Sequence, residues 1–91
     1  MRILRIDVDL TVTEIDVEKD DWMTKDIDWD VVRIDEEHDA WVDDAGLLRT
    51  DGRYGIVAGR RIPLPAYVAG VDGERTVGAT IEVDALRAMI G

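Results

Sequence analysis

The chain has 91 residues and a formal net charge of −10, because 21 acidic residues outnumber 11 lysines and arginines. This length predicts a single domain, 1–91, with a modest hydrophobic core. Cysteine and serine are both absent, which excludes disulfides, thiolate metal sites and nucleophilic serine or cysteine chemistry. No apolar run reaches the roughly 18 residues of a membrane span, and an acid interrupts any signal-like stretch at the start. We therefore expect a cytoplasmic protein.

The acidic residues are concentrated in the first half of the chain. Residues 1–44 hold 16 acidic and five basic residues, whereas residues 45–91 hold five acidic residues and six arginines. A surface of this charge repels nucleic acids and anionic membranes and attracts basic partners. Direct binding to nucleic acid or to a membrane is therefore not expected.

The first half predicts short strands joined by polar turns. Valine and isoleucine are abundant and phenylalanine is absent, a composition that favours strands. Alternation of apolar and polar residues predicts a hairpin with strands over 2–8 and 11–17, turning near Asp9 and Leu10. Residues 18–28 are polar and predict a loop or one short helix. Two further strands follow, over 29–34 and 38–43, with an acidic turn between them.

The second half contains the clearest turn signals. Asp51-Gly52 predicts a turn, and the two prolines in 62–65 make that stretch an edge strand or a connector. Residues 66–71 and 75–83 predict a hairpin with an Asp-Gly turn, and Asp84 is expected to cap a short C-terminal helix. Together these elements predict an α+β, mainly-β fold. We expect a mostly antiparallel sheet of five to seven strands with one or two short helices.

No residue pattern points to catalysis, to a metal or to a cofactor. The single histidine, His38, lies among acids and is interpreted as a surface side chain rather than a general base. Acids and threonines between Asp7 and Glu18 match calcium-loop spacing, but Val12 occupies the position where the loop turn requires glycine. We therefore expect a protein that is not an enzyme.

The acidic residues between positions 20 and 44 form the first candidate binding surface. It is either a solvated face that favours solubility or salt adaptation, or an array that imitates the phosphates of a nucleic acid in a basic groove. In this segment Trp22 is the candidate interface anchor, and Trp41 is expected in the core. The residues proposed to contact a basic protein are Asp20, Asp21, Trp22, Asp26, Asp28, Asp30, Glu36, Glu37 and Asp39.

The second candidate site lies in the near-neutral half. Arg60 and Arg61 either balance the acidic face internally or grip a phosphate or carboxylate. With Tyr54, they would let the protein act as an oligomeric sponge for a small ligand such as a nucleotide. A structural or assembly component that binds neither kind of partner is the third alternative.

The segments 30–35 and 38–48 are similar to the centre of a family of small uncharacterised proteins. That family is common in actinobacterial phages and related mobile elements. Residues 1–17 and 60–90 are similar in layout to its first hairpin and its closing strands, whereas 18–28 depart from it, because family members have a longer amphipathic helix there. The resemblance implies a phage-type accessory protein in the host cytoplasm, with no activity to transfer. Our leading hypothesis is an inhibitor of a basic defence or nucleic-acid-binding protein.

Overall fold

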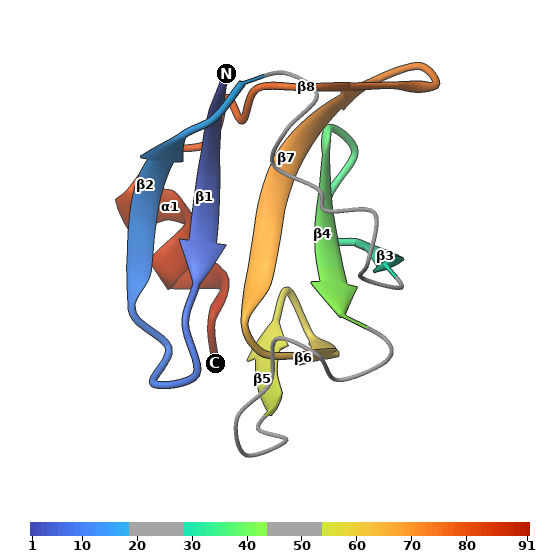
Figure 1. Ribbon diagram of the computed structural model, residues 1–91. Coiled ribbons are helices and arrows are strands. Elements are labelled where there is room, and N and C mark those ends of the chain that lie inside the picture. Colours follow the sequence, from blue (N-terminus) through green and yellow to red (C-terminus); the bar gives the residue numbers. More distant parts are fainter. Residues whose placement is uncertain (19–28, 44–53) are drawn as a thin grey trace.

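A computed structural model describes residues 1–18, 29–43 and 54–91, and Figure 1 shows the arrangement of its elements. The loop or helix expected over 18–28 and the turn expected at Asp51-Gly52 lie essentially outside these residues. The described strands are β1 (Arg2–Ile6), β2 (Val12–Asp16), β3 (Trp29–Arg33), β4 (His38–Asp43), β5 (Tyr54–Val57), β6 (Arg60–Pro63), β7 (Ala66–Asp72) and β8 (Arg75–Val77), and the helix is α1 (Val83–Met89).

Six of the strands form one antiparallel sheet. Its order is β2-β1-β7-β4-β3, and β8 pairs with the C-terminal end of β7. β5 and β6 form a separate two-stranded antiparallel sheet. The predicted mainly-β fold, with an antiparallel sheet of five to seven strands and a short C-terminal helix, is confirmed. β7 joins the two N-terminal hairpins, because it pairs with β1 on one side and with β4 on the other.

The hairpin β1–β2 forms as predicted, with its turn at Asp9 and Leu10. The register pairs Arg2 with Asp16 and Ile6 with Val12. Leu10 has a φ of 70°, a conformation that usually favours glycine or asparagine. The turn is stabilised locally, because the Thr11 N–H donates to Asp9 Oδ1 at 3.0 Å and the Leu10 N–H to the Asp7 carbonyl at 2.9 Å.

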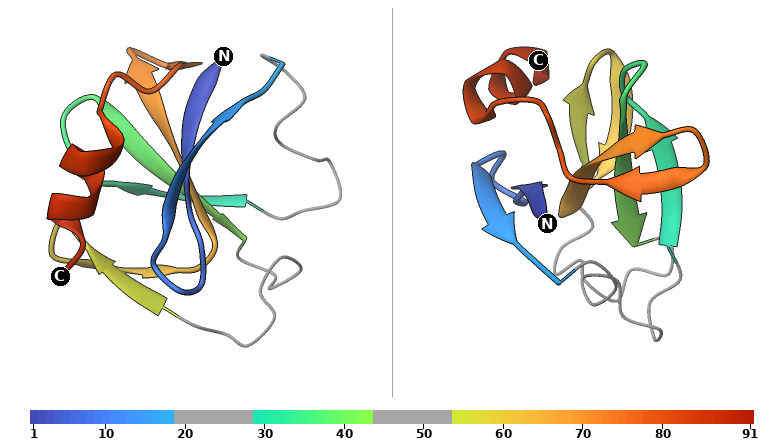
Figure 2. Two further views of the ribbon diagram at one scale, coloured as in Figure 1. Left: turned by 90° about the vertical axis from the view of Figure 1, so that its left-hand side faces the viewer. Right: turned by 90° about the horizontal axis from the view of Figure 1, so that it is seen from above.

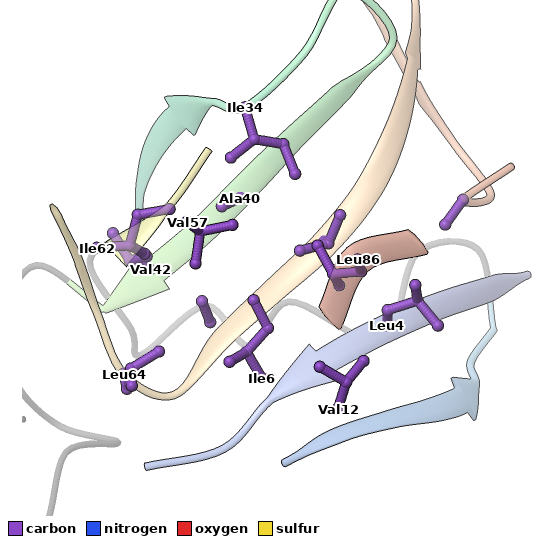
Figure 3. Packing of buried hydrophobic residues seen from close by; sticks show 13 residues of the cluster. Leu4, Ile6, Val12, Ile34, Ala40, Val42, Val57, Ile62, Leu64 and Leu86 are labelled. Carbon is purple, nitrogen blue, oxygen red and sulfur yellow. The ribbon is translucent and has the colours of Figure 1, made fainter. Parts of the chain in front are cut away.

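One face of the large sheet carries the hydrophobic core. Figure 2 shows that α1 and the β5–β6 hairpin lie on the same side of this sheet. Period-2 alternation places the apolar residues of β1, β7 and β4 on that face. Leu86 of α1, with Val57 and Ile62 of the hairpin, packs against them (Figure 3). The central residues of the cluster are Leu4, Ile6, Ala40, Val42, Val57, Ile62, Leu64, Ala66, Val68 and Leu86.

The chain that follows α1 is attached to the β5–β6 hairpin. Ile90 forms an isolated bridge with Val57. The Ala58 N–H donates to the Met89 carbonyl at 2.8 Å, and the Gly91 N–H donates to the Ile56 carbonyl at 3.0 Å. The helix and the small sheet therefore form one continuous layer over the core.

The last hairpin is shorter than predicted. β8 ends at Val77 rather than at residue 83, and α1 begins at Val83 after an N-cap at Glu82 that makes no side-chain capping bond. Asp84 lies in the first turn of α1, so its prediction as the capping residue is wrong. Residues 78–82 leave the sheet and connect β8 to α1. Among the described residues, no helix has the length and apolarity needed to cross a membrane.

Candidate interaction surface

The structure describes four of the nine residues proposed to contact a basic partner. Asp30 lies on β3, Glu36 and Glu37 lie in the β3–β4 turn, and Asp39 lies on β4. The remaining candidates lie outside the described residues: Asp20, Asp21, Trp22, Asp26 and Asp28.

Glu36 and Glu37 are exposed, and neither has a cationic partner among the described residues. Their turn is closed by the Ile34 N–H, which donates to the His38 carbonyl at 3.1 Å. The Glu37 N–H donates to Asp35 Oδ1 at 2.7 Å. These local bonds present two adjacent carboxylates at one end of the sheet.

A second acidic turn lies beside the first. The Val71 N–H donates to the Glu37 carbonyl at 2.7 Å, which places the end of β7 next to the β3–β4 turn. The β7–β8 turn therefore adds two exposed acids, Asp72 and Glu74, to this end of the molecule, although Arg75 lies 3.9 Å from Asp72. Sequence reasoning identified the Asp-Gly turn but not this proximity, because the pairing of β4 with β7 joins residues about thirty positions apart.

Asp30 is exposed but lies at the other end of β3. It lies six positions before Glu36, and the four steps from Asp30 to Ile34 alone span about 13 Å of extended chain before the turn begins. Asp30 Oδ1 accepts the N–H of Val31 at 2.9 Å. The described candidate acids therefore follow β3 and its turn as a line rather than as a compact cluster.

Asp39 differs from the other three because it is buried, with 9% exposure. The register places it opposite Arg33, whose Nε lies 2.5 Å from Asp39 Oδ1. The alternation of the strand turns this side chain to the sheet face that carries Trp41 and Tyr67. Asp39 therefore neutralises Arg33 and presents little charge to a partner.

Among the described strands, β3 is the last on its side of the large sheet, as the view from above in Figure 2 shows. The bond from Ile34 to His38 marks a hydrogen-bonded pair, so alternation turns the backbone groups of residues 31 and 33 away from β4. The Val31 N–H that bonds to the Asp30 carboxylate is one of these outward groups. Val31 itself is 39% exposed, which is unusual for a large apolar residue in this structure.

The arginines of the described residues divide into two groups. Arg2, Arg5, Arg33, Arg75 and Arg87 each lie within 4.0 Å of an acidic side chain. Arg60 and Arg61 have no acidic partner among the described residues. The Arg61 guanidinium lies 4.2 Å from the ring centroid of Tyr54, which is 46% exposed. The structure thus brings the residues of the second candidate site together on the β5–β6 hairpin, and their role in ligand binding stays a prediction.

Three aromatic residues, Trp29, Trp41 and Tyr67, lie on the sheet face opposite α1. Trp29 and Tyr67 meet edge to face with their ring centroids 5.7 Å apart, and Arg5 lies over Tyr67 at 5.6 Å. Trp41 is half-buried on this same face and is not part of the main core cluster that we expected it to join. The reason is alternation, because its neighbours Ala40 and Val42 take the core face of β4.

His38 is not a surface side chain, so its sequence-based interpretation is wrong. It is 3% exposed, and Nδ1 lies 3.1 Å from Asp35 Oδ1. Nε2 accepts the N–H groups of Thr80 and Ile81 at 3.0 and 3.3 Å. The ring therefore joins the β3–β4 turn to the connector between β8 and α1.

Arg2 holds the same connector from the β1 side. Its Nη1 donates to the carbonyls of Ala79 and Ile81 at 2.8 and 2.9 Å, and the Ala79 N–H donates to the Arg2 carbonyl at 2.8 Å. The connector passes so close to β7 that a Cβ at Gly70 would lie 2.4 Å from the Gly78 carbonyl oxygen. These contacts explain why the chain leaves the sheet after Val77. Sequence reasoning did not identify His38 or Arg2 as contacts of this connector, because each lies about forty or more positions away from it in the chain.

The described residues contain no group of three histidine, aspartate or glutamate side chains placed to hold a metal ion. No protein-family model, curated protein or solved structure shows significant similarity to this chain. The proposed function consequently depends on the exposed residues and on the fold that positions them.

Proposed function

We propose that this protein is a non-enzymatic, phage-type accessory protein. In this proposal its acidic surface binds and inhibits a basic host protein that handles nucleic acid or takes part in defence. The observation that carries the proposal is the set of exposed carboxylates along β3 and its turn, Asp30, Glu36 and Glu37, which have no cationic partner among the described residues. Such carboxylates can occupy arginine and lysine sites that otherwise bind phosphates.

The charge balance of the rest of the chain supports the same proposal. Five of the described arginines lie next to acids other than Asp30, Glu36 and Glu37, so they do not compensate these three exposed carboxylates. With a net charge of −10, the whole molecule attracts a basic protein from a distance. This attraction extends over roughly 10 Å at 0.1 M salt and raises the association rate.

The environment of His38 supports a function without catalysis. Both ring nitrogens lie within hydrogen-bonding distance of the protein's own groups, and the ring is buried. A general base must reach a proton of the substrate. His38 instead acts in the described structure as a structural link between two segments of the chain.

The proposal predicts that reversing the charges of the β3–β4 turn abolishes partner capture. The variant E36K/E37K should retain basic nucleic-acid-binding proteins from a host lysate about 10- to 100-fold more weakly than the wild type, because the two lost charge pairs together contribute on the order of 1.4–2.8 kcal/mol. Capture is measured on immobilised protein at 50 and 500 mM NaCl, and a double-stranded DNA oligonucleotide should displace what is bound.

The matched control is E18K/D84K, which makes the same change in net charge at exposed positions away from β3. This variant should still capture the partner, and both variants should melt near the wild-type temperature. If E36K/E37K and the control retain the same proteins as the wild type, the acidic turn serves solubility only and the proposal is wrong.

A further inference from the structure

We propose that the partner contributes an extended basic segment that adds to the sheet as a strand beside β3. The inference rests on the proposed function, and it specifies both the contact element on this chain and the kind of segment that it accepts. Strand addition to an open sheet edge is a common way of binding an extended peptide, because main-chain hydrogen bonds supply affinity and alternate side chains supply specificity.

The backbone of β3 has the geometry that strand addition requires. Residues 31 and 33 turn their N–H and C=O groups away from β4, and among the described strands β3 is the last on its side of the sheet. Its register with β4 runs without interruption from Trp29 to Arg33. The strand contains no proline, glycine or bulge, three of the devices that protect an edge, and its charged residues are Asp30 and Arg33.

One of these outward groups, the Val31 N–H, donates to Asp30 Oδ1. This bond is local, and a carbonyl of an added strand can replace it. The exchange releases the Asp30 carboxylate to meet a lysine or arginine of the incoming segment. Backbone pairing and charge pairing therefore occur together at the same residue.

The side chains along β3 define the chemistry of the segment. Val31 exposes an apolar surface on one face of the strand, and Asp30 points to the other face. Glu36 and Glu37 follow at the end of the strand, and Arg33 does not repel a basic segment strongly because Asp39 neutralises it. A segment that alternates basic and apolar residues fits both faces.

The opposite edge of the sheet, β2, lacks this combination. Glu14 there lies 3.0 Å from Arg2 Nε, and Asp16 lies 3.0 Å from the terminal ammonium group. Its residues Thr13 and Glu14 are exposed and polar, with no exposed large apolar side chain comparable to Val31. Of these two edges, β3 is therefore the one that combines an exposed apolar side chain with exposed acids that have no cationic partner among the described residues.

The test uses a defined probe, an eight-residue peptide of alternating lysine and valine with blocked ends. A second peptide of the same sequence carries N-methyl groups on every residue, so that neither edge of the strand has donors while the charge is unchanged. We expect the unmethylated peptide to bind at least tenfold more tightly in a titration followed by NMR. The amides of Val31 and Arg33 should exchange with solvent more slowly in its complex.

Val31→Pro tests the same contact from the protein side. The substitution removes an N–H that points away from β4, so it spares the ladder with β4 and proline is tolerated best at such an edge position. It should weaken peptide binding at least tenfold, whereas Val31→Thr, which keeps the N–H, should change binding less than threefold. Thermal melting shows whether each variant folds, and the N-methylated peptide gives an answer without any change to the protein.

The possible results separate the two proposals. Equal binding of the two peptides overturns strand addition at β3. If E36K/E37K still abolishes partner capture in that case, the acidic surface binds its partner through side chains alone. If E36K/E37K captures the partner normally, the proposed function fails as well. Weak, equal binding of both peptides to wild type and to E36K/E37K overturns the inference, because the contact is then unspecific charge attraction.

Discussion

Two polar side chains, His38 and Arg2, determine the path of the chain between β8 and α1. Neither belongs to the connector, yet together they satisfy backbone groups of residues 79–81 that have left the sheet. Buried backbone donors and acceptors are costly when they lack partners. A histidine and an arginine, residue types common in binding sites, thus make here the hydrogen bonds that a neighbouring strand would otherwise make.

We predict that His38→Ala strongly destabilises the domain. Two part-buried backbone N–H groups lose their acceptor, at about 0.5–1.5 kcal/mol each, and loss of the buried ring leaves a cavity. The free energy of unfolding should fall by about 2–4 kcal/mol, a large fraction of the stability of a small domain. Urea unfolding followed by tryptophan fluorescence measures this change.

The neighbouring exposed residue provides the control for this experiment. Glu36→Ala removes a side chain without a cationic partner among the described residues and should change the free energy of unfolding by less than about 0.5 kcal/mol. If His38→Ala unfolds at the same urea concentration as wild type, the connector does not depend on the ring for its stability.

Among the secondary-structure elements, α1 depends most on its surroundings. It has seven residues, and an isolated helix of this length is unstable in water. Leu86 is its fully buried residue, and the pairing of Ile90 with Val57 holds the chain after it. The helix therefore forms because it covers the sheet, as its apolar residues predicted.

We predict that Leu86→Ala lowers the free energy of unfolding by about 2–5 kcal/mol, the range found when a buried leucine is truncated and leaves a cavity. Calorimetry or urea unfolding provides the measurement. Arg87→Ala on the exposed side of the same helix should cost less than about 0.5 kcal/mol, since its ion pair with Asp84 is solvent-exposed. A result in which both variants are equally stable would show that α1 contributes little to the core.

For the whole molecule, the excess of acidic residues predicts that salt stabilises the fold. A net charge of −10 on a domain with a radius of gyration of 12.0 Å produces self-repulsion, which salt screens. The ion pairs Arg75–Asp72 and Arg87–Asp84 have both partners largely exposed, so screening them costs little. Raising NaCl from 20 to 300 mM should increase the melting temperature by roughly 4–8 °C, corresponding to about 1 kcal/mol.

The variant E18K/D84K serves again as a comparison here. Its net charge is less negative than that of the wild type, so its melting temperature should increase less when salt is added. A melting temperature of the wild type that falls as salt is added would mean that the ion pairs outweigh the repulsion between acids.

The strands and hairpins were predictable because their signals are local. Alternation over five or six residues indicates a strand, and turn residues such as Asp9 or Asp72-Gly73 lie between the strands that they join. The three hairpins β1–β2, β3–β4 and β7–β8 therefore follow from sequence alone, as does the apolar side of α1. The exposed acids Asp30, Glu36 and Glu37 were also identified correctly as surface residues of this region.

Only the tertiary structure decides how these hairpins combine. The sheet order depends on β7 pairing with β1 and β4, which are remote in sequence, and this pairing brings the two acidic turns together. The same arrangement of strands buries Asp39 against Arg33 and places His38 in contact with the connector between β8 and α1. It also makes β3 the last of the described strands on its side of the sheet. Such outcomes depend on contacts between segments separated by tens of residues, which no local pattern encodes. The acidic composition is therefore a property of the sequence, whereas the surface that those acids form is a property of the fold.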